Sequence, residues 1–390
     1  MTGIGCNGNN GVLYVKFLLE LLKIVDGGLN NNKEKVRAYA LALAEKIDRD
    51  GDRKAADRIR GVVGNFSTGN NSTLTLAGAS AAAVTPVDSE SRLALADVEF
   101  IPKGSVEIFL EPDIDDSVTE FLRFVRAADR LIANKVGITP SLLAYGPPGC
   151  GKTELARYIA SELELPLVTA RSDGLVSSYL GSTSKNLRML FDYASSKPCV
   201  LFLDEFDAFA KLRDDTHEMG ELKRAVVSLL QNIDSLDSHT ILLAASNHEH
   251  LLDPAVWRRF AYKVHLVPPS IDVRARLFCR FLGDTVTEKE IEDAATVAID
   301  FSGSDIRQVC QDELRETVVS DSIHTDVNRL LLRCLRRRLH NTDFSASTLE
   351  VKLQLAREIS PEIFTYRRLA EMFGISHKHV GNLLKKGSKP

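Results

Sequence analysis

Closely spaced cysteines are missing from this chain of 390 residues. The cysteines are scattered, so neither a zinc site nor a disulfide framework is indicated. Unpaired cysteines of this kind are typical of a reducing compartment, and we expect a cytoplasmic protein. The six residues are Cys6, Cys150, Cys199, Cys279, Cys310 and Cys334.

A strong charge of either sign is also missing. Lysine and arginine number 49 against 53 acidic residues, which gives a formal net charge of -4. No global attraction to nucleic acid or to a membrane surface is therefore expected, and any such attraction would have to be local. Hydrophobic residues make up 44% and charged residues 26%, as in ordinary globular proteins, and the length allows two or three compact units.

No apolar run near the start is long enough to span a bilayer. The most apolar segment there, VLYVKFLLELLKIV at residues 12–25, is too short and is interrupted by Lys16, Glu20 and Lys23. It has no preceding basic segment and no small-residue cleavage site after it, so it does not resemble a signal peptide. We interpret it as a packed amphipathic helix and expect no membrane partner.

The remaining chain divides by pattern. Residues 1–64 are predicted to form a small helical unit, with a turn at DGGLNNN between its first two helices. Residues 65–95 are rich in Ser, Thr, Gly, Asn and Ala, which is typical of a flexible linker. For the last third of that segment, irregular structure packed on the next domain is an alternative.

Between residues 100 and 268, short apolar runs alternate with helical patterns, which indicates an α/β domain with a parallel sheet. Residues 269–340 are predicted to be helical only, and a last helical segment covers residues 346–390. The predicted strands lie in SLLAYG, PLVTA, CVLFLD, TILLAASN and KVHLV.

A phosphate-binding loop is predicted at GPPGCGKT, between the strand-like SLLAY and the helix-like ELARYIASEL. Glycines let backbone N–H groups converge on a phosphate, and the following helix adds its positive N-terminal end. Lys152 is expected to reach the β- and γ-phosphates of ATP, and Thr153 to place its hydroxyl on Mg²⁺. The candidate nucleotide-binding residues are Gly146, Pro147, Pro148, Gly149, Cys150, Gly151, Lys152, Thr153 and Glu154.

Acidic and amide side chains follow the next predicted strands. Asp204 and Glu205 end the buried run CVLFLD, where a second Mg²⁺ ligand and a general base for the attacking water are needed. Asp204 fits the metal and Glu205 the base, although acidic residues also end strands for structural reasons. Asn247 ends TILLAASN and is expected either to orient the same water or to hold the γ-phosphate, although without these neighbours it would be interpreted as a strand terminus.

Two adjacent arginines follow in LLDPAVWRRF. Arg258 and Arg259 are either solvated surface charges or arginine fingers that reach the nucleotide of a neighbouring subunit. The second interpretation would make hydrolysis depend on assembly.

The order GPPGCGKT, SSYLG, VLFLDEFDAF, LLAASN, LDPAVWRRF and FSGSDI is similar to the AAA subfamily of AAA+ ATPases, over roughly residues 110–320. The resemblance implies a P-loop NTPase fold with a helical lid, and ring hexamers that bind nucleotide between subunits. It implies Walker A roles for the phosphate loop, Walker B roles for Asp204 and Glu205, and a sensor role for Asn247. It also implies that Gly303 and Ser304 line the nucleotide from the lid and that Arg224 lies at the subunit interface.

The resemblance also gives an account of the exposed apolar pair in SSYLGSTSKN. Tyr179, Leu180 and Gly181 match the triplet that lines the central pore of relatives, where an aromatic ring grips an unfolded chain. Local packing of Tyr179 on the sheet is the alternative. The charged residues 211–224 are either a second pore segment or a solvated loop. The helical N-terminus, HEMGELKR and WRRF resemble bacterial ATPases found beside subtilisin-like proteases and implicated in phage defence.

The C-terminal TYRRLAEMFGISHKHVGNLLKKG, residues 365–387, resembles a helix-turn-helix. Gly374 is expected at the turn with positive φ, Ser376 as the N-cap of the second helix, and Val380 in the core. The segment is locally basic, which favours DNA contact, while a packing module or a protein-binding module is the alternative. The candidate recognition residues are His377, Lys378, His379 and Asn382.

Together these patterns predict an ATP- and Mg²⁺-dependent ATPase. One hypothesis is a remodeller that threads protein through a central pore, with a protease as a partner in bacterial defence. The other is a DNA-associated ATP switch or loader that uses the C-terminal segment. A sensor whose ATP state only gates a partner is a third.

Overall fold

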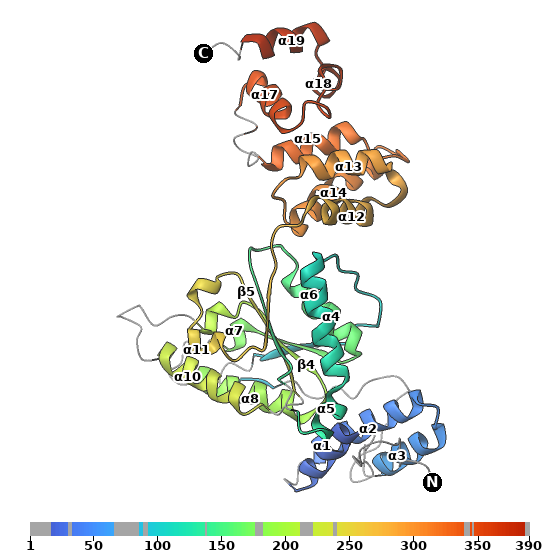
Figure 1. The fold of residues 1–390 in the computed structure, drawn as a ribbon, viewed down its shortest axis with the longest axis vertical. Coiled ribbons are helices and arrows are strands. Elements are labelled where there is room, and N and C mark those ends of the chain that lie inside the picture. The colour runs from blue at the N-terminus through green and yellow to red at the C-terminus, as the bar shows by residue number, and fades with distance from the viewer. Residues whose placement is uncertain are drawn as a thin grey trace. The chain divides into compact units, whose positions relative to one another are not determined.

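The computed structural model describes residues 17–29, 33–65, 86–88, 93–136, 139–175, 182–210, 221–236, 240–338, 344 and 347–386. The chain divides into two compact units (Figure 1). The first comprises residues Met1–Ile108, Ile114–Gly146 and Lys152–His265. The second comprises Phe109–Asp113, Pro147–Gly151 and Leu266–Pro390. In the described part of the chain, no helix has the length and apolar character needed to cross a membrane.

Three helices open the first unit: α1 (Leu18–Leu29), α2 (Lys33–Arg49) and α3 (Arg53–Asn65). The prediction of a turn at DGGLNNN was wrong in part, because α1 continues through Asp26, Gly27, Gly28 and Leu29. A Cβ at Gly27 would lie 3.0 Å from Val36 Cγ2, so the missing side chain allows the two helices to pack closely.

The sheet of the first unit has six strands in the order β1-β3-β4-β5-β2-β6. The predicted apolar runs all form strands, and these five pair in parallel. The carboxyl ends of β2, β4 and β5 therefore meet at one edge of the sheet. The bounds are β1 Ala96–Glu99, β2 Ser141–Tyr145, β3 Leu167–Ala170, β4 Val200–Leu203, β5 Ile241–Ser246 and β6 Tyr262–His265.

Strand β1 was not predicted, and it pairs antiparallel with β3. Just before it, Leu95 N donates to Pro86 O at 2.8 Å and Asp88 N to Leu93 O at 2.9 Å. Leu95 is fully buried in the core of the sheet. Within the last third of the predicted linker, the structure describes residues 86–88 and 93–95, and Leu95 packs in the core of the sheet domain.

Helices cover both faces of the sheet. Figure 1 shows α4 and α6 on one side and α8 and α10 on the other. Leu201, Leu203 and Leu242 of the strands pack with Leu190 of α8 and Leu229 of α10 in one core. The helical bounds are α4 Pro112–Arg126, α5 Ala128–Ala133, α6 Lys152–Leu163, α7 Ser172–Leu175, α8 Ser182–Ser196, α9 Asp207–Ala210, α10 Glu221–Asp234, η1 Glu249–Leu251 and α11 Pro254–Trp257.

The second unit is helical, as predicted for residues 269–340. Its first helix begins at an N-cap, where Ser270 accepts from Val273 N, and α13 and α14 begin with capping boxes at Thr287 and Ser302. The bounds are α12 Ile271–Leu282, η2 Gly283–Thr285, α13 Glu288–Val297, α14 Gly303–Val319, α15 Val327–Arg338, α17 Leu349–Ile359, α18 Tyr366–Phe373 and α19 His377–Lys386.

The two helical segments that were predicted as separate domains share one hydrophobic core. Leu330 and Leu331 of α15 belong to the same buried cluster as Leu353 of α17, Leu369 of α18 and Val380 of α19. The Arg368 guanidinium also reaches Asp293 Oδ2 of α13 at 2.6 Å. The C-terminal helices are therefore built into the helical unit.

Candidate nucleotide-binding site

The predicted phosphate loop joins the carboxyl end of β2 to the N-terminus of α6, as the pattern requires. Three of its glycines have positive φ, at Gly146 (134°), Gly149 (78°) and Gly151 (95°), a region that residues with a Cβ rarely adopt. The loop is tied to β5 because Gly146 N donates to Ser246 O at 3.3 Å. Lys152 is buried, and its Nζ donates to Gly146 O at 2.7 Å across the loop.

Gly149 lies against the start of α14. Ser304 N donates to Gly149 O at 3.1 Å. A Cβ at Gly149 would lie 2.2 Å from Ser304 Oγ and 2.7 Å from Ser302 Oγ, which is closer than any real contact. The structure thus brings the predicted pair Gly303 and Ser304 to the loop, and only glycine fits at the point of contact.

The hydroxyl and the carboxylate that were predicted to hold Mg²⁺ lie side by side. Thr153 Oγ1, at the start of α6, donates to Asp204 Oδ2 at 2.9 Å. Asp204 Oδ1 accepts from Glu205 N at 2.9 Å within the turn that follows β4. Glu205 is exposed and has φ +50°, an uncommon conformation for a residue with a side chain. Such backbone strain is often found at functional sites.

These oxygens suit a hard divalent cation. Mg²⁺ prefers oxygen ligands and usually takes one or two from the protein, with water and substrate phosphate completing its shell. The described residues contain no cluster of three or more His, Cys, Asp or Glu side chains placed to hold a metal on their own. A site made of Thr153, Asp204 and a nucleotide phosphate is consistent with both observations.

Sequence reasoning missed Asp207, the first residue of α9. Its Oδ1 accepts from Ser246 Oγ at 3.0 Å and from Asn247 N at 3.3 Å. Phe206 N also donates to Ala245 O at 2.8 Å. The turn after β4, which carries Glu205, is thereby joined to the end of β5, which carries Asn247. The sequence did contain a signal for Asp207, because it is a third carboxylate close to Asp204 and Glu205.

The two adjacent arginines differ in their surroundings. The Arg259 guanidinium donates to both carboxylate oxygens of Asp234, at 3.1 and 3.0 Å, and to Ala255 O at 2.9 Å. The hydrogen bonds from Arg259 lower the pKa of Asp234. Arg258 is exposed, and none of the residues that the structure describes bonds to its guanidinium.

Some of the predicted pore and interface residues are not among those that the structure describes. Tyr179, Leu180 and Gly181 are outside the described residues, and so are residues 211–220. Arg224 lies on α10, and its side chain is also outside what the structure describes.

A parallel sheet whose strand β2 runs into a glycine-rich Lys-Thr loop and a helix defines the class of P-loop nucleotide-binding proteins. Residues 142–267 match the model of the family described as "ATPase family associated with various cellular activities (AAA)". They include all of the phosphate loop, Asp204, Asn247 and both arginines.

Three proteins from different organisms are similar to this chain over part of their length. An "Uncharacterized AAA family ATPase y4kL" of Sinorhizobium fredii is 38% identical over 217 residues, 55% of this chain and 66% of that protein. A "Proteasome-activating nucleotidase" of Methanococcus vannielii is 31% identical over 316 residues, 72% of this chain and 75% of that protein. "Protein SUPPRESSOR OF K(+) TRANSPORT GROWTH DEFECT 1" of Arabidopsis thaliana is 34% identical over 185 residues, 46% of this chain and 42% of that protein.

The chain therefore belongs to the AAA family, and its α/β domain is an ATP-hydrolysing domain of that family. It spans less than two thirds of the length of two of these three relatives.

Proposed function

We propose that this protein hydrolyses Mg²⁺-bound ATP at the interface between subunits and uses the energy to remodel a protein substrate. Lys152 and the amides of the phosphate loop bind the phosphates, and Thr153 and Asp204 hold the metal. The metal, when bound, offsets the negative charge of the phosphates. Glu205 accepts a proton from the attacking water, and Asn247 orients that water.

The observation that supports this proposal most is the hydrogen bond of 2.9 Å between Thr153 Oγ1 and Asp204 Oδ2. It joins the helix that follows the phosphate loop to the acidic end of the central strand. Glu205 is next in sequence and exposed, so its carboxylate is accessible to water beside a bound phosphate. Asp207 holds the Asn247 backbone against the same turn. These groups together suit hydrolysis of a phosphoanhydride.

The different surroundings of the two arginines support a role for a neighbouring subunit. Arg259 bonds to Asp234 of its own chain and so fixes the segment after α11 against the end of α10. Arg258 is exposed on that fixed segment, where its guanidinium is available to the nucleotide of a neighbour. We therefore assign Arg258 as the arginine finger and Arg259 as the residue that positions it.

Replacing the two arginines one at a time tests that assignment. Arg258→Ala should lower the rate of hydrolysis by about 10³-fold or more while ATP still binds, as for arginine fingers in general. Arg259→Lys should lower the rate less than Arg258→Ala does, because it keeps a positive charge beside Asp234 although the two-pronged geometry is lost. ATP turnover and binding of a fluorescent ATP analogue are the measurements. A full rate for Arg258→Ala in the assembled protein would contradict the assignment.

A protein substrate is supported by the relative named for proteasome activation and by the Tyr-Leu-Gly triplet at residues 179–181. The direct test is a trap. Glu205→Gln should bind ATP without turning it over, so that a substrate stays bound and can be purified and identified. Glu205→Gln with Tyr179→Ala is the matched control. Recovery of protein by the first variant and not by the second supports threading, whereas full turnover by Glu205→Gln would remove Glu205 as the base.

DNA association is a second candidate, favoured by the surface of the C-terminal helices. His377, Lys378, His379 and Asn382 are all exposed on α19, while Val380 is buried. Gly374 has φ +64°, and Ser376 Oγ accepts from His379 N at 3.2 Å, and both features support the helix-turn-helix prediction. Under this proposal, Lys378→Ala with Asn382→Ala abolishes binding to duplex DNA in a gel-shift assay. If the wild-type chain does not bind duplex DNA at low salt, this candidate is wrong.

A further inference from the structure

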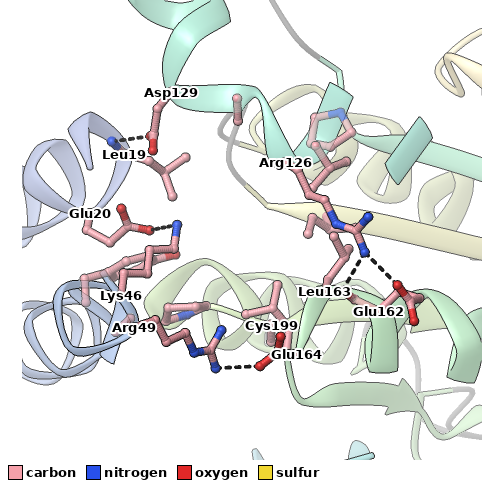
Figure 2. Close-up of a pocket in the computed structure, with 18 of the residues that line it drawn as sticks. Leu19, Glu20, Lys46, Arg49, Arg126, Asp129, Glu162, Leu163, Glu164 and Cys199 are labelled. Carbon is pink, nitrogen blue, oxygen red and sulfur yellow. Dashed lines mark hydrogen bonds and ion pairs between the residues drawn. The ribbon is translucent and has the colours of Figure 1, made fainter. Parts of the chain in front are cut away.

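A cavity of about 310 Å³ lies in the first unit, between the N-terminal helices and the sheet domain (Figure 2). Pro140, Cys199 and Ile241, which lie at the starts of β2, β4 and β5, form part of its wall. The cavity is therefore at the amino edge of the parallel sheet, opposite the phosphate loop. We call it the amino-edge cavity. Leu19, Tyr39 and Ala42 of α1 and α2 supply apolar walls on the other side.

Ion pairs neutralise the cations that line this cavity. Arg49 of α2 and Lys103 both bond to Glu164, at 2.7 and 3.1 Å. Arg126 of α4 bonds to Glu162 of α6 at 2.7 Å. Figure 2 shows Arg49 with Glu164, and Arg126 with Glu162. Arg49, Lys103 and Arg126 therefore each have a carboxylate partner.

The side formed by α1 differs, because two carboxylates, those of Glu20 and Asp129, lie there and only that of Glu20 bonds to Lys46 among the described residues. Lys46 Nζ bonds to Glu20 Oε1 at 2.7 Å. Asp129 Oδ1 accepts from Leu19 N at 2.7 Å and anchors the first turn of α1. The second oxygen, Glu20 Oε2, is buried, and no described residue forms a hydrogen bond with it. In Figure 2 this oxygen points toward the side on which Asp129 lies.

An unpartnered carboxylate oxygen is costly at such a depth. The Glu20 side chain is only 3% exposed. Burial raises the pKa of Glu20 even though Lys46 opposes the shift, and the charge of Asp129 adds to the rise. A hydrogen-bond donor with a positive charge would satisfy the oxygen and balance the second carboxylate.

We propose that the amino-edge cavity binds a small organic cation, a primary amine or a guanidinium compound, through Glu20 Oε2 and the charge of Asp129. The volume suits a compact molecule with an apolar body against Leu19, Tyr39 and Ala42. An organic cation fits better than a bare metal ion, because a cavity of about 310 Å³ with apolar walls has room for a carbon skeleton as well as a charge. The ligand would touch both α1 and the sheet domain and so strengthen their contact.

Benzylamine and agmatine, titrated into the full-length protein, test this proposal. Isothermal titration should show saturable binding of at least one of them. Benzyl alcohol and benzoate share the shape of benzylamine and lack its positive charge, so they should bind more weakly by about tenfold or more. If neither amine binds, or if benzyl alcohol and benzoate bind as well as the amines, the proposal is wrong.

Glu20→Gln keeps the size of the side chain and removes its charge, and it should weaken amine binding by about tenfold or more. Asp129→Asn keeps an acceptor for Leu19 N and should also weaken binding. The matched control is Glu45→Gln, an exposed position of α2 outside the cavity, which should bind the amine as the wild type does. Circular dichroism confirms that each variant is folded. Unchanged binding by Glu20→Gln would overturn the assignment of Glu20.

Discussion

At the scale of the residue, Gly149 is the most constrained position of the candidate site. Its φ of 78° disfavours any side chain, and the hydroxyls of Ser302 and Ser304 occupy the space that a Cβ would need. Gly104 has a similar φ of 73°, but a Cβ there would meet nothing within 4 Å. A substitution at either glycine introduces backbone strain, but only a substitution at Gly149 also introduces a steric clash. Comparing the two therefore distinguishes the two costs.

We predict that Gly149→Ala loses ATP affinity by about tenfold or more, because Ser304 and the start of α14 must move away from the loop. Gly104→Ala should bind ATP normally and lose only about 1–2 kcal/mol of unfolding free energy to backbone strain. Equilibrium binding of a fluorescent ATP analogue and urea denaturation provide both values. Equal ATP affinity in the two variants would contradict the close contact at Gly149.

Glu20 leads to a prediction about pH. Burial raises its pKa in the folded protein above the ordinary value of 4.5, so the folded state holds this proton more tightly than the unfolded state does. The contribution of Glu20 to stability is therefore present below pH 4.5 and is lost as the pH rises through the folded-state pKa. In the Glu20→Gln variant the side chain at position 20 does not titrate. Lys46 and Asp129 face that side chain in the variant as they do in the wild type.

The melting temperature of the wild type minus that of Glu20→Gln should consequently decrease as the pH is raised from 4.5 toward neutrality. Thermal denaturation at a series of pH values is the measurement, with Glu45→Gln as the surface control. A difference that is constant, or that increases with pH, would show that Glu20 is not destabilised by burial.

At the scale of the element, the strands and loops that are determined by a local pattern of apolar and glycine residues could be predicted from the sequence. Strands β2–β6 are apolar runs between helical segments, and the Gly-Lys-Thr loop and Asp204 follow such runs directly. Strand β1 was missed because its four residues, Ala96–Glu99, show only one buried position. The extension of α1 through Gly27 was missed because two adjacent glycines are typical of a turn, and the close approach of Gly27 to Val36 of another helix is not visible in a local pattern. Asp207 and Asp234 were missed for the same reason, since their partners are distant in sequence.

The core shared by α15, α17, α18 and α19 gives a prediction at this scale. Leu369→Ala of α18 removes a fully buried side chain and should cost about 2–5 kcal/mol of unfolding free energy. Because all of these helices share one core, α12–α15 should lose hydrogen-exchange protection together with α17–α19 in this variant. Lys378→Ala, on the exposed face of α19, should change stability by no more than about 0.5 kcal/mol. Loss of protection in α17–α19 alone would show that they form a separate unit.

At the scale of the whole molecule, the sheet of the first unit separates two sites. Thr153, Asp204 and Asn247 lie at its carboxyl edge, and the amino-edge cavity lies at the other end of the same strands. Strands β2, β4 and β5 reach both edges and are almost entirely buried. The amine-binding proposal and the ATPase proposal rest on different residues, so either can fail without the other.

The central claim is that each active site takes Glu205 from one subunit and Arg258 from its neighbour. Mixing two inactive variants, Glu205→Gln and Arg258→Ala, tests it most directly. Random assembly in equal amounts pairs an intact Glu205 with an intact Arg258 at about one interface in four. We predict that ATP turnover, which each variant lacks alone, appears on mixing. No recovery in assemblies shown to contain both chains would contradict the claim.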